Sequence, residues 1–176
     1  MASPLDVHRE LLERWRRAMD LVGPGPIEEH FLDAQGAIAG LQARGRWADL
    51  GSGAGFPGVA LAAAFPEANV LLVERRQKRA AFLREVVAHA GLTNAEVVEA
   101  DSESLESSSF DGIISRAYRP PAEYLRDALR LTRPGGTAVL LTAGDSPAPP
   151  AGLAVFHVEH YFVEGKPRAS IRLRRQ

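Results

Sequence analysis

The fold is decided by residues 46–58, Arg46-Trp-Ala-Asp-Leu-Gly-Ser-Gly-Ala-Gly-Phe-Pro-Gly58. A short apolar run ends at Asp49, and glycines then recur through the rest of the stretch. Glycine lets the backbone turn sharply and lets a ligand approach it closely. Pro57 suits the first position of a helix, because proline presets φ and lacks an N–H that would be unbonded there. We therefore expect a strand, a glycine turn and a helix over residues 59–65 whose free N–H groups point at a ligand. This is the first half of a nucleotide-binding βαβ unit.

An acidic residue after the next strand supports this interpretation. Residues 69–74 read as a buried strand that ends in Glu74, 19 residues after Gly55. This is about the spacing at which a carboxylate reaches the hydroxyls of a ribose at the end of the second strand. The sequence therefore predicts a cofactor of the adenosine type.

The glycine turn leaves two kinds of cofactor open. The segment from Gly53 to Gly58 fits the pattern Gly-x-Gly-x-x-Gly, which is typical of nicotinamide and flavin dinucleotides. Asp49, however, lies at the mouth of the expected site, where a carboxylate would repel a pyrophosphate. The same carboxylate suits the ammonium group of S-adenosyl-L-methionine, and this argument favours a methyltransferase over a dehydrogenase.

Composition limits the other possibilities. The chain has 176 residues, no cysteine and a net charge of −1. Its length suits one domain, and the lack of cysteine excludes disulfides, thiolate metal sites and a cysteine nucleophile. Its apolar runs are too short to cross a bilayer, and the start of the chain does not resemble a signal peptide. We expect a cytoplasmic protein without membrane association, whose contacts to any RNA depend on locally concentrated basic residues.

Two helices are expected before the first strand. Ser3 followed by Pro4 is typical of a helix start, and apolar residues recur at helical spacing as far as residue 22. A second apolar stripe over residues 27–41 predicts another helix. We expect residues 1–44 to form a small helical cap on a core of residues 45–176, within a single domain.

The rest of the chain alternates between strands and helices. Further strands are expected over residues 95–101, 110–116 and 137–142, with helices ending near residue 90 and spanning 121–131, and loops over 102–109, 133–136 and 144–152. The end of the chain reads as an antiparallel hairpin around residues 164–167. This predicts an α/β fold with a mostly parallel, seven-stranded sheet that ends in an antiparallel hairpin. The hairpin also disfavours a dehydrogenase, whose nucleotide-binding domain ordinarily ends in a parallel strand.

Several motifs in this chain match a known family. They are Asp49-Leu-Gly-Ser-Gly-Ala-Gly-Phe-Pro-Gly58, Lys78-Arg79 with Phe82-Leu-Arg84, Phe110-Asp-Gly-Ile-Ile-Ser-Arg-Ala117 and Glu29-His-Phe-Leu-Asp33. On these the chain resembles the Rossmann-like class I methyltransferases that use S-adenosyl-L-methionine. More narrowly it resembles the RsmG (GidB) family, which methylates N7 of a guanine in small-subunit (16S) ribosomal RNA. The resemblance runs from about residue 15 to residue 174.

The resemblance also implies roles for individual residues. Gly51, Gly53 and Phe56 would lie against the cofactor. Asp49 joins these predicted cofactor residues on the charge argument given above. Glu74 would hold the ribose, and Ser102 and Glu103 would border the adenine. Arg116, at the end of the fourth core strand, would lie where cofactor and target base meet, and it is our candidate catalytic residue. Its alternative role is to tie that strand to a neighbouring carboxylate.

Three segments depart from the family pattern. The family has Asn-Leu-Thr where this chain has Asp20-Leu-Val22, and it has an arginine at the position of Asp101. Its Leu-Lys-Gly is here Thr142-Ala-Gly144, which lacks a lysine able to contact RNA. The alternatives are therefore a methyltransferase with a substrate other than ribosomal RNA, and a non-catalytic RNA-binding module that retains the cofactor fold.

The chemistry that the resemblance implies agrees with the residues present. Guanine N7 carries a lone pair and no proton, so methylation there needs positioning rather than a general base. The chain shows no Ser-His-Asp order, and its His157 and His160 would point to opposite faces of a strand rather than form a metal pair. We expect a monomer without a metal, whose partner is small-subunit ribosomal RNA or its assembly particle. The basic end, residues 172–175, is either an RNA contact or a frayed, solvated terminus.

Overall fold

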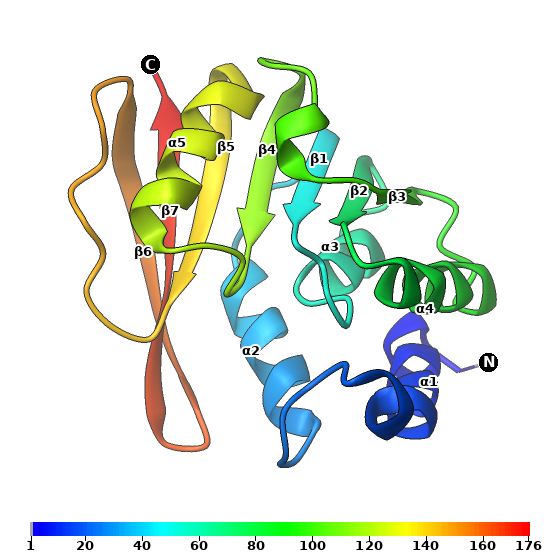
Figure 1. The fold of residues 1–176 in the computed structure, drawn as a ribbon. Helices are drawn as coiled ribbons and strands as arrows, with labels where there is room; N and C mark the ends of the chain where they lie inside the picture. The colour runs from blue at the N-terminus through cyan, green and yellow to red at the C-terminus, as the bar shows by residue number, and fades with distance from the viewer. Residues whose placement is uncertain (1) are drawn as a thin grey trace.

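A seven-stranded sheet runs through the protein, whose computed structural model describes residues 2–176 (Figure 1). The strands are β1 (Gly45–Leu50), β2 (Ala68–Glu74), β3 (Ala95–Glu99), β4 (Phe110–Ser115), β5 (Thr132–Thr142), β6 (Leu153–Val163) and β7 (Lys166–Arg175), in the spatial order β3-β2-β1-β4-β5-β7-β6. The first five pair in parallel. Strand β7 is antiparallel to both β5 and β6. The mostly parallel sheet with a terminal antiparallel hairpin is as the sequence predicted.

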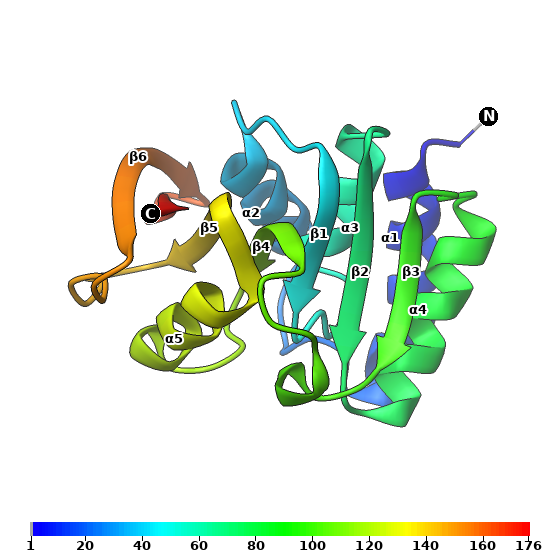
Figure 2. The same ribbon diagram turned by 90° about the horizontal axis from the view of Figure 1, so that it is seen from above.

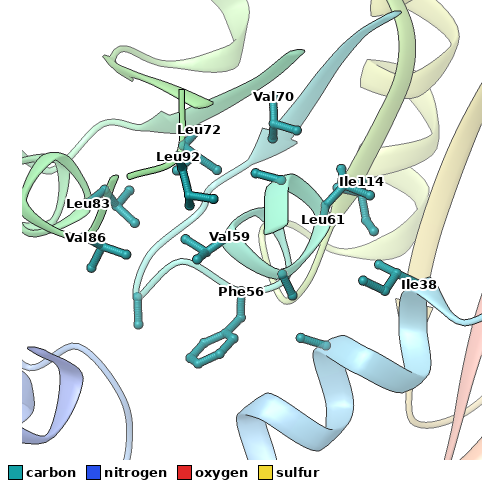
Figure 3. Close-up of a cluster of buried hydrophobic side chains, with 14 of the residues drawn as sticks. Ile38, Phe56, Val59, Leu61, Val70, Leu72, Leu83, Val86, Leu92 and Ile114 are labelled. Atoms are coloured by element: carbon teal, nitrogen blue, oxygen red, sulfur yellow. The ribbon is translucent and has the colours of Figure 1, made fainter. Parts of the chain in front are cut away.

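Helices cover the two faces of the sheet unequally (Figure 2). The helices are α1 (Pro4–Met19), α2 (Glu28–Ile38), α3 (Gly58–Ala64), α4 (Gln77–His89) and α5 (Pro121–Leu131). The first four share one hydrophobic cluster with the sheet, while α5 packs on the opposite face with a second cluster. Figure 3 shows the centre of the first cluster, where Val59 and Leu61 of α3 lie near Val70 of β2 and Ile114 of β4.

The two N-terminal helices belong to the larger helical layer. Helix α1 begins with the expected cap, in which the Ser3 hydroxyl accepts from the Asp6 N–H and the Asp6 carboxylate accepts from Ser3. Helix α1 packs on α3 and α4, and α2 packs on α3, β6 and β7. Leu12 and Phe31 are buried in the same cluster as α3. Both helices therefore pack beneath the glycine turn and hold it in place.

Several boundaries differ from those that the sequence predicts. Strand β5 begins at Thr132 rather than at residue 137, because Thr132 pairs with Phe110 across an irregularity in the register. Strand β3 ends at Glu99, since Asp101 instead accepts from the Glu103 N–H and caps a short 3₁₀ turn. Pro57 is the residue before helix α3 rather than its first residue.

The basic end of the chain is not frayed. It forms strand β7, where Arg172 is only 4% exposed. Its guanidinium donates to the Ala39 carbonyl, and those of Arg174 and Arg175 donate to the Gly135 and Thr132 carbonyls. These arginines therefore hold the last strand in place, which corrects the expectation of a solvated terminus.

The parallel strands end together at the lower edge of the sheet in Figure 1. The loops that follow β1, β2, β3 and β4 line one cavity beyond the carboxyl ends of these strands. The tip of the β6–β7 hairpin extends below the sheet in Figure 1. In open α/β sheets, ligands bind outside the carboxyl ends of the strands. Within residues 2–176, no helix is both long enough and apolar enough to cross a membrane.

Candidate cofactor and substrate site

The glycine turn and the acid after β2 are bonded to each other. The Gly53 N–H donates to Oε2 of Glu74 at 3.0 Å, and the Arg76 N–H donates to Oε1 at 2.8 Å. Gly51 has a φ of 69° and Gly53 a φ of 56°, in the left-handed region that favours glycine. A Cβ on Gly51 would also come within 2.6 Å of the Tyr118 ring. The turn therefore requires glycine at both positions, and it fixes the Glu74 carboxylate.

Asp49 lies under this turn and is fully buried. Its Oδ2 accepts from the Gly58 N–H at 2.9 Å, while its Oδ1 has no hydrogen-bond partner within residues 2–176. Burial raises the pKa of this carboxyl to about 7. The first N–H of α3 is therefore bonded to Asp49 rather than free to meet a ligand, which corrects that part of the sequence interpretation.

A cavity of about 250 Å³ opens beside the turn and contains three of the predicted cofactor residues. They are Gly51, Glu74 and Ser102. The Ser102 hydroxyl is hydrogen-bonded to the Tyr118 hydroxyl, which joins the loop after β3 to the loop after β4. The rest of the lining comes from Val73, Arg75, Arg76, Arg79, Ala100, Asp101, Ala117, Tyr118 and Arg119. Tyr118 was missed from the sequence, although it directly follows the Ser115-Arg-Ala117 segment.

Five predicted cofactor residues lie outside this lining, namely Asp49, Gly53, Phe56, Glu103 and Arg116. The Phe56 ring is buried 4.9 Å from the Phe31 ring and 4.8 Å from the His8 ring, beneath the glycine turn. Glu103 is exposed, and its carboxylate lies 3.4 Å from Arg119. The structure thus brings together the glycine turn, Glu74 and Ser102, and places Phe56 and Glu103 elsewhere.

Arg116 joins the end of β4 to helix α2. Its Nη1 donates to Oδ2 of Asp33 at 3.1 Å, and its guanidinium lies 5.0 Å from the centre of the Phe56 ring. Asp33 also accepts from the Tyr161 hydroxyl at 2.8 Å. Burial and this neighbouring carboxylate raise the pKa of Tyr161, so the phenol stays protonated. The link to a carboxylate that the sequence left as the alternative role of Arg116 is thus present.

A second cavity, of about 490 Å³, lies on the other side of the loop after β4. It shares Ala117, Tyr118 and Arg119 with the first cavity. Its remaining lining is His30, Asp33, Ser115, Arg116, Pro121, Tyr124, Leu140, Leu141, Thr142, Ala143 and Arg168. Burial and the nearby Arg116 lower the pKa of His30, which favours a neutral imidazole. Arg116 therefore lines this cavity while it is paired with Asp33.

Arg119 holds the loops that separate the two cavities. Its Nη2 lies 3.1 Å from Oδ1 of Asp101, and its Nη1 lies 3.6 Å from Oδ2 of Asp127 on α5. Asp101, which departs from the family pattern, is thus paired with an arginine from the next loop. Within residues 2–176, no group of three or more His, Asp or Glu residues is arranged to hold a metal.

Comparisons with known proteins decide the family. A model of the GidB family, described as rRNA small subunit methyltransferase G, matches residues 3–148. The chain belongs to the GidB family. It is 36% identical over 172 residues to ribosomal RNA small subunit methyltransferase G of Methylibium petroleiphilum, a match that covers 90% of this chain and 77% of that protein. The protein of the same name from Xanthomonas euvesicatoria is 37% identical over 174 residues, covering 93% and 81%. The resemblance identified from the sequence motifs is confirmed.

Solved structures support the fold of this GidB-family chain. An O-methyltransferase from Bacillus cereus in complex with SAH aligns with a TM-score of 0.65 at 19% identity, covering 97% of this chain and 90% of that one. A mutant of MtNAS in complex with S-adenosylmethionine gives a TM-score of 0.70 at 17% identity, covering 98% and 71%. At such identities the similarity concerns the fold, which is the class I methyltransferase fold that the sequence predicted.

Proposed function

We propose that this protein is a methyltransferase that uses S-adenosyl-L-methionine to methylate N7 of a guanine in small-subunit (16S) ribosomal RNA. The observation that carries the proposal is the pair of adjoining cavities at the carboxyl ends of the strands, which share the Ala117–Arg119 loop. One cavity holds the residues expected around an adenosine, and the other holds Arg116. A methyl group has to pass between two bound molecules, and such a pair of cavities provides for both. Family membership supplies the substrate class.

The first cavity suits the cofactor. Each oxygen of the Glu74 carboxylate accepts one backbone N–H, and a carboxylate has about four acceptor positions, so positions remain for ribose hydroxyls. The unpartnered Oδ1 of Asp49 is an uncompensated buried acceptor, and a cationic ammonium group nearby would favour the ionised carboxyl. The sulfonium of S-adenosyl-L-methionine supplies an electrophilic methyl group.

The second cavity suits the target base. Arginine commonly binds guanine through its O6 and N7 edge. We infer that Arg116 donates to O6 and leaves the N7 lone pair free for in-line attack, while Asp33 holds the guanidinium in position. N7 faces the deep groove of an RNA helix, which side chains do not enter, so the target would be an unpaired guanine. Phe56 contributes by packing under Arg116 rather than by touching the cofactor.

The proposed substrate also suggests where and how the protein works. Ribosomal subunits assemble in the cytoplasm, and we place the protein there. We propose that it acts as a monomer, because both cavities are formed within one chain. We also propose that it needs no metal, because the N7 lone pair attacks without loss of a proton.

The decisive experiment is transfer of labelled methyl from S-adenosyl-L-methionine to small-subunit particles and naked ribosomal RNA from a strain that lacks this gene. The proposal requires label in 7-methylguanine at a single position. Label in another base, protein or small molecule would favour a different substrate. Absence of transfer by protein that binds S-adenosylhomocysteine would favour the non-catalytic RNA-binding alternative.

Arg116 is tested within the same assay. The Arg116→Ala variant should lose most transfer, about a hundred-fold or more, since it removes a base contact made during positioning. Arg44→Ala is the control, because Arg44 is an exposed arginine before β1, paired only with Glu67 at 3.2 Å among the described residues. Full activity of Arg116→Ala with normal cofactor binding would contradict the proposed role.

A further inference from the structure

The tip of the β6–β7 hairpin carries the most exposed large apolar side chain of the described structure. Phe162 is 72% exposed. A phenyl ring left in water lacks the stabilisation that burial of its apolar surface would give. Nothing in the fold requires an aromatic ring here, because Tyr161, the preceding residue, makes the contacts to α2 through Asp33 and Gly36. Phe162 is therefore a candidate for contact with another molecule.

The register of the sheet places this ring beside the second cavity. His160 of β6, Ala169 of β7 and Thr142 of β5 are paired side by side across the three strands. Phe162 pairs with Pro167 and is two residues closer to the tip than His160. Alternate residues of a strand share a face, so Phe162 and Thr142 are on the same face of the sheet, about 12 Å apart by standard strand spacings. Thr142 lines the second cavity. The ring is thus within the reach of one or two nucleotides from a base bound in that cavity.

Two cations lie near the tip, on the face of the hairpin opposite the Phe162 ring, since Arg168 pairs with Tyr161 and Lys166 with Val163. Lys166 has a 61% exposed side chain, and Arg168 lines the second cavity. Acids are present too: Glu164 is at the turn, Lys166 lies 3.6 Å from Glu29, and Arg168 lies 4.0 Å from Asp33. Arg172, Arg174 and Arg175 lie towards the other end of β7, where they bond to the Ala39, Gly135 and Thr132 carbonyls. The cations near the tip are therefore Lys166 and Arg168.

We propose that the hairpin tip is an RNA-contact surface on which the Phe162 ring stacks with an unpaired base next to the methylated nucleotide. The inference rests on the proposed function, which requires an unpaired guanine in the second cavity. Bases beside an unpaired target are available for stacking, and proteins that bind single-stranded RNA combine an aromatic platform with nearby cations. Phe162 acts as a positioning residue: it fixes the flanking nucleotide so that the target base enters the cavity.

The test compares variants of Phe162 with a matched control on the same strand. Phe156 is also exposed, at 48%, but it lies six residues away along β6, and its ring packs 4.6 Å from the Arg174 guanidinium. We expect Phe162→Ala to raise KM for naked ribosomal RNA about ten-fold, the effect of losing one stacked base. The kcat at saturating RNA and the affinity for S-adenosylhomocysteine should change less than two-fold. Phe162→Trp should restore KM, and Phe156→Ala should behave as wild type.

A direct readout accompanies the kinetics. Stacking with a base quenches indole fluorescence, so titration of Phe162→Trp with an unstructured oligoribonucleotide should quench its added emission, after subtraction of the wild-type signal from Trp15 and Trp47. An unchanged KM in Phe162→Ala would overturn the proposal. So would a loss seen only with assembled particles and not with naked RNA, because the surface would then bind a ribosomal protein. A wild type that transfers no methyl to RNA would overturn the proposed function instead, while the fluorescence titration still decides the contact.

Discussion

At the scale of single residues, two buried ionisable groups lie under the glycine turn and have opposite effects on stability. The carboxyl of Asp49 has a pKa raised to about 7, and the imidazole of His8 has one lowered to about 4, both through burial. The Nε2 of His8 lies 2.7 Å from the Ala54 carbonyl of the turn. The turn is therefore held from below by one acid and one imidazole that are both partly or wholly neutral at pH 7.

The raised pKa of Asp49 predicts that cofactor affinity depends on pH. Only the ionised carboxyl attracts an ammonium group, so the affinity for S-adenosylhomocysteine should rise between pH 6 and pH 8, around the pKa of about 7. In Asp49→Asn this rise should disappear, and at pH 8 binding should weaken by about ten-fold. Calorimetric titration at several pH values measures both effects. Glu67→Gln, a change at an exposed acid before β2, is the control, and a pH dependence retained in Asp49→Asn would contradict the prediction.

The same two groups predict how stability changes with pH. The folded protein keeps His8 neutral while the unfolded chain protonates it near pH 6.5, so this group costs about 2 kcal/mol of stability as pH falls from 7 to 5. Folded Asp49 holds its proton up to about pH 7, far above the ordinary aspartate pKa of 3.8, so its contribution falls by a similar amount as pH rises from 5 to 7.

Replacing one of the two groups should therefore leave only the pH dependence of stability that the other group causes. Urea unfolding of Asp49→Asn should show stability that increases from pH 5 to pH 7, and His8→Gln should show stability that decreases. The wild-type profile should be flatter than either. Identical profiles for all three proteins would show that neither group titrates as its surroundings indicate.

At the scale of elements, features that depend on local sequence patterns were predicted, whereas features that depend on contacts between distant segments were missed. The positions of α1, α4 and α5 follow from patterns within the segments themselves, with a side-chain cap at the start of α1. The link between Gly53 and Glu74 follows from the regular length of a βαβ unit. The start of β5 was missed because Arg133-Pro-Gly-Gly136 has the composition of a turn, whereas pairing of Thr132 with Phe110 extends the strand.

In the candidate site, too, contacts between residues far apart in the chain were not predicted. Arg116 was found from its motif, but its partner Asp33 is 83 residues away in the chain, and no local pattern joins them. Tyr118 was missed because its contact with Ser102 exists only after two loops meet. Phe56 belongs to a motif that implies the cofactor, yet the side chain points into the core, which depends on how α1 and α2 pack.

The packing of α2 on β6 gives a prediction at this scale. A Cβ on Gly36 would overlap the ring of Tyr161, which is held in place by its bond to Asp33. Gly36→Ala should destabilise the protein by about 1–3 kcal/mol through this overlap. That exceeds the gain of about 0.5–1 kcal/mol expected from alanine inside a helix. Urea unfolding measures the difference.

The control for this variant is Gly23→Ala, since no atom of the described chain lies within 4 Å of a Cβ at Gly23 and its stability should change little. Combining Gly36→Ala with Tyr161→Ala should remove most of the penalty of the alanine. If Gly36→Ala is as stable as wild type, the helix and the hairpin are not packed as described.

At the scale of the whole molecule, a ligand bound in the first cavity should raise the free energy of unfolding. The turn, Glu74 and the loop after β3 belong to one sheet with α1–α5 packed on it, so a ligand of the first cavity binds only the folded chain. S-adenosylhomocysteine at 100 times its Kd should then add about 2.7 kcal/mol to the free energy of unfolding. For a chain of this length, that raises the Tm by about 5–10 °C.

The same thermal melt separates the two cofactors that the glycine pattern allows. NAD at the same concentration should leave the Tm unchanged, because its pyrophosphate would lie close to the Asp49 and Glu74 carboxylates. In Asp49→Asn the shift with S-adenosylhomocysteine should shrink, while the Tm without ligand should not fall at pH 8, since a buried carboxylate has been removed. A shift with NAD that equals the shift with S-adenosylhomocysteine would mean that the carboxylates do not select the cofactor, and the argument from Asp49 to a methyl donor would fail.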